Sequence, residues 1–384
     1  MTTLAGPPLW QRIKPHLAVF DLPMLLILFV LSCAGMLVMW SAAFDFPGRF
    51  VDHFRNYMIM LCVMFVLANV SPQILLRVAV PLYVVGVVLL IGVEAFGIIR
   101  KGAQRWLNVG VTVIQPSELM KIALPLMMAW YFNKYESMLK FKDFIIAGVI
   151  LLIPFALILK QPDLGTGLLI LSSGLFVLFF AGFPWRIIIP LTVAAVIGLV
   201  TIVVMEDRLC APDFDWRILH EYQKNRVCTL LDPFNDPLGK GFHTIQAMIA
   251  IGSGGFIGKG YMQGTQTHLE FIPERTTDFI LAVYSEEFGL IGVLLLIACY
   301  IALIFRGLSI AAAAPTAFTR LLAGAMSMIF FVYAFVNMGM VGGILPVVGV
   351  PLPFMSYGGT ALLTLGVACG ILMSIARQKG LVQR

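Results

Sequence analysis

The sequence predicts an all-α polytopic membrane protein with about ten transmembrane helices and a large extracytoplasmic loop between helices 7 and 8. The chain of 384 residues is 60% hydrophobic and only 12% charged, whereas a soluble domain carries about 25% charged residues. So little charge cannot cover a water-facing surface, but a surface that faces lipid needs none. The mean hydropathy of +0.95 agrees, and we expect a single membrane domain over residues 1–384.

The apolar segments are long enough to cross a membrane, which takes about 20 residues each. The first segment is too long for the hydrophobic region of a signal peptide and lacks a convincing cleavage site, so we expect an uncleaved span. The fourth, fifth and tenth segments are short or interrupted, which leaves their boundaries approximate. The predicted spans are 22–43, 55–71, 78–96, 117–133, 144–160, 164–183, 187–205, 279–305, 321–344 and 360–376.

Lysine and arginine in the short loops indicate the orientation, because they are enriched on the cytoplasmic side. The opposite loop 345–359 carries no charge, and the opposite loop 206–278 is too long to obey this rule. The exception is 97–121, whose four basic residues predict an anionic ligand at the outer face. With ten spans, both termini are cytoplasmic, together with Arg12, Lys14, Arg77, Lys134, Lys140, Lys142, Arg186, Arg306, Arg320, Arg377, Lys379 and Arg384.

The net charge of +6 is modest, and no basic run stands out. We therefore expect attraction to anionic membrane lipid and no binding of nucleic acid. Four of the six cysteines fall within spans, while Cys210 and Cys228 lie in the long loop without the spacing of a zinc site. A disulfide between these two is the prediction if the loop lies in an oxidising compartment, and two free thiols are the alternative.

The outer segment before the fourth span carries charge into the membrane. Pro116 suits the first turn of a helix that Gln115 or Ser117 can cap. Glu118 and Lys121 then share one helical face. Charges inside the membrane are a functional hypothesis by default, and a pair that only neutralises itself is the alternative.

Three further outer features are candidates for the same site. Arg105 beside Trp106 suits a phosphate held at the interface, with simple anchoring as the alternative. Asp163, at the junction of the fifth and sixth spans, is more simply a helix cap, but its place beside the other outer polar groups keeps a site role open. The glycine-rich stretch 252–260 lacks a glycine and a Ser or Thr that a Walker A motif requires. Its N–H groups suit a diphosphate, but a re-entrant turn is the simpler interpretation.

The segment Glu270–Phe279 brings acids to the start of the eighth span. Thr276 or Thr277 can cap the helix and place Asp278 in its first turn, which is the structural alternative to a catalytic role. A polar stripe then carries an acid about 12 Å along the helix, so the stripe must face a cavity or other helices instead of lipid. The stripe consists of Asp278, Ala282, Ser285, Glu286 and Gly289.

The last outer loop, Gly343–Gly359, is apolar yet cannot be a regular helix, because Pro346, Pro351 and Pro353 remove backbone donors. Irregular backbone at membrane depth is buried in protein or lines a cavity. An apolar groove beside polar outer groups suits an amphiphile that has a lipid tail and a polar head.

These motifs resemble those of the SEDS family (shape, elongation, division, sporulation) over nearly the whole chain. Gly349–Gly359 is more similar to the elongation members than to the division members. The departures are small: Thr276 stands where histidine is usual, and Tyr284 and Ser285 stand where the family often has Leu-Ala. The motifs are Lys101–Gly110, Gln115–Lys121, Gln161–Thr166, Leu230–Gly260, Glu270–Phe279 and Gly343–Gly359.

The resemblance implies a peptidoglycan glycosyltransferase that polymerises lipid II at the outer face of the bacterial cytoplasmic (inner) membrane during cell elongation. It also implies a class B penicillin-binding protein, the transpeptidase, as partner. Asp278 matches the essential loop aspartate of the family and is the predicted catalytic residue. The predicted substrate-binding residues are Arg105, Trp106, Glu118, Lys121, Asp163, Glu274 and Ser356.

The expected reaction joins the GlcNAc 4-hydroxyl of one lipid II to MurNAc C1 of the growing chain, with inversion at C1. Asp278 would act as the base, Arg105 and Lys121 would stabilise the leaving diphosphate, and Glu118 would orient Lys121. No cofactor is certain, and a divalent cation (Mg²⁺ or Mn²⁺) stays open although no metal-ligand spacing indicates it. The alternatives are a lipid II flippase, a non-catalytic scaffold of the cell-wall synthesis complex, and another lipid-linked sugar polymerase.

Overall fold

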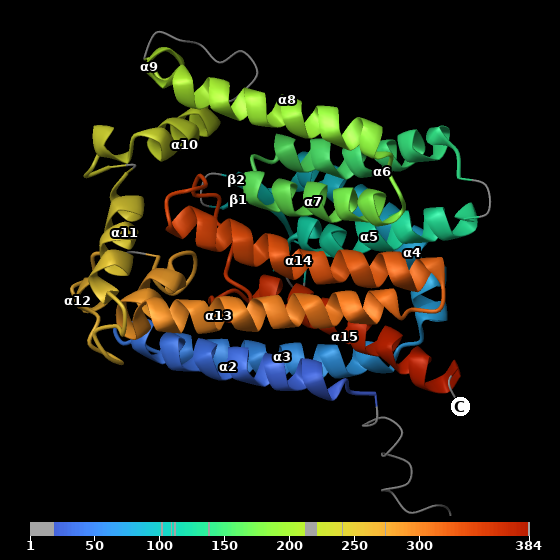
Figure 1. Ribbon diagram of the computed structural model, residues 1–384, viewed down its shortest axis with the longest axis horizontal. Coiled ribbons are helices and arrows are strands. Elements are labelled where there is room, and N and C mark those ends of the chain that lie inside the picture. The colour runs from blue at the N-terminus through green and yellow to red at the C-terminus, as the bar shows by residue number, and fades with distance from the viewer. Residues whose placement is uncertain are drawn as a thin grey trace, which may run out of the picture.

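The computed structural model describes residues 19–382 apart from 101–102, 109, 111–112, 137–138, 212–220, 240 and 273. Long helices in this part of the chain run side by side as one bundle (Figure 1), which confirms the all-α fold class, and each of the following ten overlaps one predicted span. They are α2 (Leu22–Ala42), α3 (Arg49–Asn69), α4 (Pro72–Phe96), α5 (Pro116–Lys134), α6 (Phe141–Lys160), α7 (Leu164–Phe180), α8 (Trp185–Val204), α13 (Ile280–Ala312), α14 (Ala317–Val341) and α15 (Gly359–Val382).

Eight of these helices, among the described residues, are long and apolar enough to cross a membrane. The other two are α5, which carries Glu118, Lys121 and Lys134, and α7, which has 17 residues. The chain is therefore a multi-pass membrane protein, while the count of about ten spans stays a prediction. Part of the orientation argument falls outside the described residues, namely Arg12, Lys14, Lys101 and Arg384.

The helix starts follow from local sequence. The carboxylate of Asp21 accepts a hydrogen bond from a first-turn N–H of α2 at 3.1 Å, and Asp163 accepts one from the N–H of Thr166 in α7 at 3.2 Å. Such caps satisfy backbone donors that have no partner within the helix. Pro116 begins α5 as predicted, but Gln115 in the N-cap position makes no capping bond with its side chain.

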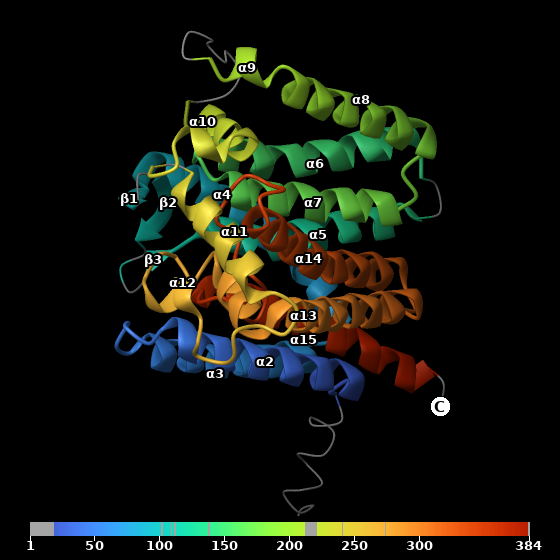
Figure 2. The ribbon, with the colours of Figure 1, turned by 60° about the vertical axis from the view of Figure 1, so that its left-hand side comes forward.

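The core of the bundle lies around α14, most of which is buried. This helix contacts α13, α7, α5 and α15. In contrast, α8 has no buried residue, and Figures 1 and 2 both show it at the edge of the bundle, beyond α6 and α7. The apolar side chains of α8 therefore suit a lipid environment.

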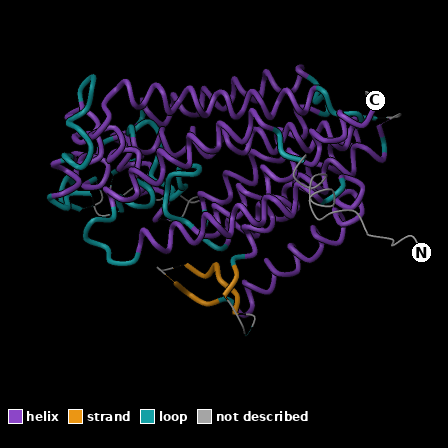
Figure 3. Tube along the Cα trace, turned by 90° about the horizontal axis from the view of Figure 1, so that it is seen from below, coloured by secondary structure: helices purple, strands orange, loops and turns teal. Residues whose placement is uncertain are grey.

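Shorter elements gather at one end of the bundle, which we call the loop end (Figure 2). An antiparallel sheet in the order β1-β2-β3 precedes α5 (Figure 3), an arrangement that the sequence did not predict. The long loop folds into short helices between α8 and α13. The bounds are β1 (Ile98–Arg100), β2 (Ala103–Asn108), β3 (Val113–Ile114), α9 (Glu206–Leu209), α10 (Glu221–Leu231), η2 (Pro233–Asn235), α11 (Phe242–Gly254) and α12 (Thr265–His268).

Candidate functional site

The charged pair at the start of α5 is held between three helices. Lys121 is 4% exposed and Glu118 is 15% exposed. The Lys121 Nζ donates to Glu118 Oε1 at 2.6 Å and to the Tyr333 hydroxyl of α14 at 2.8 Å. The Thr364 hydroxyl of α15 donates to the other Glu118 oxygen at 3.0 Å. The predicted pairing on one helical face is confirmed, and it ties α5 to α14 and α15.

Asp278 lies just before α13, and the expectation of a threonine cap with Asp278 in the first turn is wrong. The helix begins at residue 280, and its N-cap residue makes no capping bond with its side chain. The hydroxyls of the two threonines are engaged elsewhere: that of Thr276 accepts from Arg49 at 2.6 Å, and that of Thr277 donates to Glu274 at 2.8 Å. Asp278 therefore belongs to an irregular turn at the loop end.

The proline-containing loop before α15 passes between two of the predicted site residues. A Cβ added to Gly349 would lie 3.4 Å from Oδ2 of Asp278, and Gly349 has a φ of +73°, which favours glycine. The neighbouring carbonyl of Val348 would lie 2.5 Å from a Cβ added to Gly165. Gly165 lies two residues after Asp163. The consecutive loop residues Val348 and Gly349 therefore lie close to the Asp163 segment and to Asp278, respectively.

Helix α14 connects Asp278 to the charged pair. The Asn337 Nδ2 donates to the Asp278 carbonyl at 2.9 Å and to the Val350 carbonyl at 2.8 Å. Tyr333, which binds Lys121, precedes Asn337 by four residues, or about 6 Å of helix rise on the same face. Sequence reasoning missed Tyr333 and Asn337, although two polar side chains four residues apart in an apolar span are a usable signal.

Arg105 on β2 joins the sheet to the start of α7. Its Nε lies 3.7 Å from Oδ2 of Asp163 and donates to the Gln161 carbonyl at 3.4 Å, and its Nη2 donates to the Pro162 carbonyl. The Gln115 Nε2 donates to the same Asp163 oxygen at 3.3 Å. Asp163 is thus both the predicted helix cap and an ion-pair partner. The Arg105 side chain remains 30% exposed, so a ligand can still reach it.

The other predicted residues lie around this group. Trp106 is half-buried on β2 opposite Ile98 of β1. Glu274 is half-buried beside Asp278 in the same turn. Ser356 is buried, and its hydroxyl accepts from the N–H of Leu352 at 2.8 Å. The contact of Ser356 shapes its own loop, and its role in substrate binding stays a prediction.

An apolar cavity of about 560 Å³ opens beside Glu118 between α3, α4, β3, α5 and α15. Its polar lining consists of Gln115, Glu118, Thr360 and Thr364, and the rest is aliphatic. The cavity has the mixed character expected for an amphiphile, but four helices and β3 form its walls instead of the proline-containing loop.

The part of the predicted polar stripe that lies on α13 faces protein, whereas its first member, Asp278, precedes the helix and is half-buried. Ala282, Ser285, Glu286 and Gly289 are all buried. The carboxylate of Glu286 accepts from the Lys259 Nζ at 2.7 Å and from N–H groups of α12 at 2.9 and 3.2 Å. Because all of these bonds are made within the protein, Glu286 stabilises the contact between α13 and the long loop.

The glycine-rich stretch 252–260 packs against an interruption in α13. Gly289 has φ 62° and ψ −164°, which breaks the helix. The N–H groups of Lys259 and Gly260 donate to two carbonyl oxygens of α13 at 3.0 and 3.1 Å. Since these groups are bonded within the protein, the turn interpretation is favoured over a diphosphate site.

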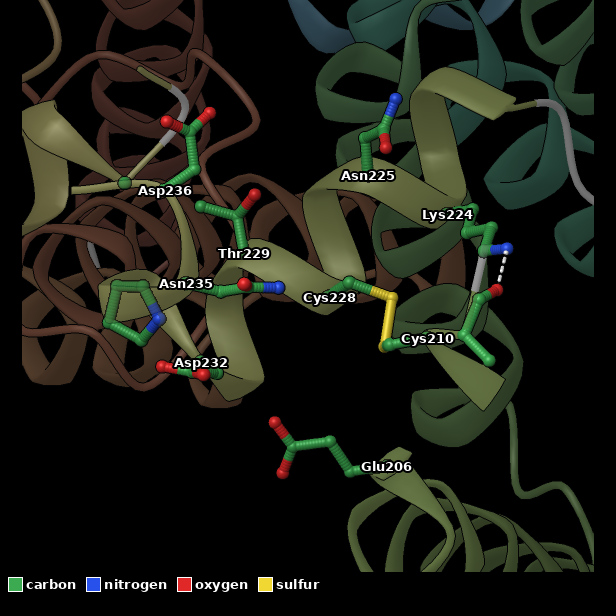
Figure 4. A pocket seen from close by; sticks show the side chains of 12 residues that line it. Glu206, Cys210, Lys224, Asn225, Cys228, Thr229, Asp232, Asn235 and Asp236 are labelled. Atoms are coloured by element: carbon green, nitrogen blue, oxygen red, sulfur yellow. Dashed lines mark hydrogen bonds between the residues drawn. A yellow bond between two sulfur atoms is a disulfide. The ribbon is translucent and has the colours of Figure 1, made fainter. Parts of the chain in front are cut away.

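The predicted disulfide between Cys210 and Cys228 is formed, with sulfur atoms 2.05 Å apart (Figure 4). It links the residue after α9 to α10, beside a polar cavity of about 310 Å³. The Lys224 Nζ at this cavity donates to a backbone carbonyl at 2.8 Å. The acidic residues in its lining are Glu206, Asp232 and Asp236, and no predicted site residue contributes to it.

Within the described ranges, no three His, Cys, Asp or Glu side chains are placed to hold a metal ion together. Glu118 binds Lys121, and Asp163 binds Arg105. These donors do not form a cation site by themselves, so we derive no step through a metal, and the divalent cation stays a prediction.

The sequence is similar to a known protein family and to individual peptidoglycan glycosyltransferases. The family model FTSW_RODA_SPOVE, a cell cycle protein family, matches residues 21–381. Peptidoglycan glycosyltransferase MrdB of Escherichia coli (strain K12) is 48% identical over 98% of this chain and 97% of its own length. Peptidoglycan glycosyltransferase RodA of Treponema pallidum is 33% identical over 94% of this chain and 98% of its own length.

Solved structures agree with these matches. A chain of a peptidoglycan synthase complex that coordinates polymerization and crosslinking has a TM-score of 0.76 and 30% identity, with 94% of this chain and 98% of that chain covered. The rod shape determining protein RodA of Thermus thermophilus has a TM-score of 0.67 and 25% identity, with 94% and 97% covered. Because the family model spans nearly the whole sequence, the chain belongs to the FtsW/RodA/SpoVE family, the SEDS family whose motifs it carries.

Proposed function

We propose that this chain is a peptidoglycan glycosyltransferase that polymerises lipid II into β-1,4 glycan strands. Two of the relatives named above are called peptidoglycan glycosyltransferases. The observation that carries the proposal is a convergence at the loop end. Asp278, the Arg105–Asp163 pair and the Glu118–Lys121 pair come from distant segments and meet around the loop before α15 and one face of α14.

The reaction requires a base at the acceptor and positive charge at the leaving group. The Asp278 carboxylate takes the proton of the GlcNAc 4-hydroxyl as that oxygen attacks C1 of MurNAc. The bond from C1 to the lipid diphosphate breaks, its electron pair leaves with the diphosphate, and C1 is inverted. Arg105, a cation that is 30% exposed, stabilises the departing charge.

We expect Lys121 to act on the diphosphate less directly than the sequence suggested. Its ammonium is bonded to Glu118 and Tyr333 and is 4% exposed, so Glu118 stands between it and the cavity. We therefore propose that Lys121 supplies positive charge from behind Glu118, which orients it. The apolar cavity beside Glu118 then accommodates part of the lipid tail, since such cavities recognise apolar groups with a few polar contacts.

We propose that the loop end lies outside the cytoplasmic (inner) membrane of a bacterium and that both termini lie inside. A reporter fused after Phe234 should work only as an extracytoplasmic reporter, and one fused at Lys140 only as a cytoplasmic one. The opposite pattern at either site would refute this orientation.

We also propose that a class B penicillin-binding protein, which crosslinks the product, is the partner of this chain. The likeness to a chain of a peptidoglycan synthase complex supports this. Co-purification of the two proteins from a membrane extract tests it, and their complete separation in mild detergent would count against it.

The activity is tested with purified protein and labelled lipid II. We expect polymer from the wild type and a loss of about 100-fold or more in Asp278→Asn, which keeps the size of the side chain. Asp52→Asn is the matched control, because the Asp52 side chain is 42% exposed and pairs only with Arg55 among the contacts of the described residues. Near-normal polymerisation by Asp278→Asn would rule out the base, and transbilayer movement of lipid II without polymer would support the flippase.

A further inference from the structure

A buried arginine lies three residues before Asp278. Arg275 is 2% exposed and is the largest fully buried side chain in the described part of the chain. A buried charge is costly unless it is paired and hydrogen-bonded. The Arg275 Nε donates to the Ala42 carbonyl at 3.0 Å, and its Nη2 donates to the Asp45 carboxylate. Both acceptors lie where α2 ends and the turn to α3 begins.

Aromatic rings complete this environment. The guanidinium carbon of Arg275 lies 5.0 Å from the ring centroids of both Phe44 and Phe46, within the range of cation–π attraction. Arg49, the first residue of α3, adds a second tie by donating to the Thr276 hydroxyl at 2.6 Å. The α2–α3 turn therefore holds two consecutive residues of the Asp278 segment.

Two other elements hold the same segment through its backbone. The Thr276 carbonyl accepts from the N–H of Tyr357 at 2.8 Å, and the Asp278 carbonyl accepts from Asn337 at 2.9 Å. The chain from Arg275 to Asp278 spans at most about 10 Å. A displacement of the Arg275 side chain should therefore also displace the Asp278 carboxylate.

We propose that Arg275, held by Asp45, is a positioning residue that fixes Asp278 for proton abstraction, a role that rests on the proposed function. Arg275 touches no reacting group and acts through the backbone of its turn. A displacement of about 1 Å in a reacting group costs about 100-fold in rate. Loss of the anchor should therefore lower kcat and leave lipid II binding largely intact.

The chain contains a matched control at the opposite end of the same two helices. Arg306 of α13 donates to the Asp21 carboxylate at the start of α2, with one bond at 2.9 Å. Arg306 lies 26 residues along α13 from its first residue, Ile280, which is about 39 Å of helix. Breaking this pair removes an ion pair between α13 and the start of α2 without touching the Asp278 segment.

The experiment compares Arg275→Met and Asp45→Asn with Arg306→Met and Asp21→Asn. The first two should lose about tenfold or more in kcat, with KM for lipid II within about twofold of the wild type. They should also speed amide hydrogen exchange across residues 274–279, which reports local opening. The two control variants should change neither quantity, and Arg275→Lys, which keeps the charge, should recover part of the kcat.

Two results would overturn the inference. One is a kcat within about twofold of the wild type in both Arg275→Met and Asp45→Asn. The other is an equal loss in the Arg306→Met control, since that would indicate general destabilisation. If the wild type makes no polymer, the proposed function fails separately, and unchanged exchange across residues 274–279 in Arg275→Met would then refute the anchor by itself.

Discussion

Breaking the pair of Glu118 and Lys121 separates a structural role from a chemical one. The two side chains are 15% and 4% exposed. Lys121→Met leaves the Glu118 carboxylate without its cation, which should lower the free energy of unfolding by about 3–5 kcal/mol. Glu118→Gln leaves the Lys121 ammonium with Tyr333 as its remaining partner and should act in the same direction. The double variant removes both charges and should return to within about 1 kcal/mol of the wild type.

Denaturant unfolding of the four proteins in one detergent measures this cycle, alongside polymerisation of lipid II. Tyr333→Phe is the control, because it removes one hydroxyl and should cost about 1 kcal/mol. If the double variant is stable but makes no glycan, the charges serve the reaction. If it is stable and active, the pair only neutralises itself. A double variant as unstable as both single variants would refute the reasoning, since the charges would then not compensate each other.

Three further outcomes follow from contacts at the loop end. Cys228→Ser should weaken the long loop by about 3 kcal/mol, because the disulfide with Cys210 closes a separation of 18 residues; alkylation of both thiols in unreduced wild type would contradict the link. Burial tends to raise the pKa of Asp45, but the hydrogen bond and charge of Arg275 outweigh it and lower the pKa below its ordinary 3.8. The contact between Asp45 and Arg275 therefore stabilises the fold above about pH 4, and this stabilisation is lost as the pH falls through the pKa of Asp45 in the folded state. The urea midpoints of wild type and Asp45→Asn should accordingly differ near neutral pH and converge in acid. Gly258→Ala places a Cβ 2.1 Å from a carbonyl oxygen at a φ of +81° and should lower the thermal midpoint through a loss of about 1–3 kcal/mol, whereas Gly252→Ala, with nothing within 4 Å, should not.

The helices and the local chemistry of the site could be predicted because they depend on nearby residues. Apolar length identified the helices of the bundle, and the spacing of Glu118 and Lys121 identified their contact. The N-cap role of Asp163 also followed from its position after a proline and before an apolar segment. Each of these features involves residues within a few positions of one another, where helix geometry alone determines which side chains are in contact.

Most features that were missed or misjudged depend on distant segments. For the threonine cap of α13, Arg49, 227 residues earlier, binds the Thr276 hydroxyl, while the Thr277 hydroxyl bonds Glu274 in its own turn. Tyr333 and Asn337 became important only when α14 packed between α5 and the Asp278 turn. A local propensity such as capping is a weak preference of about 1 kcal/mol, so a charge-assisted bond from elsewhere readily overrides it.

A charge inside the membrane suggests a functional site, but Glu118 and Glu286 show that the structure must also leave the charged group open to a ligand. Both are acids within apolar helices, and each binds a lysine at 2.6 or 2.7 Å. Glu286 is 0% exposed, and its oxygens are bonded to Lys259 and α12, which leaves no face for a ligand. Glu118 is bonded to Lys121 and Thr364 but lines a cavity of about 560 Å³. Since Lys121 lies behind it, the Glu118 carboxylate is the charged group that faces this cavity, and the lysine holds it in place at the edge of an apolar space.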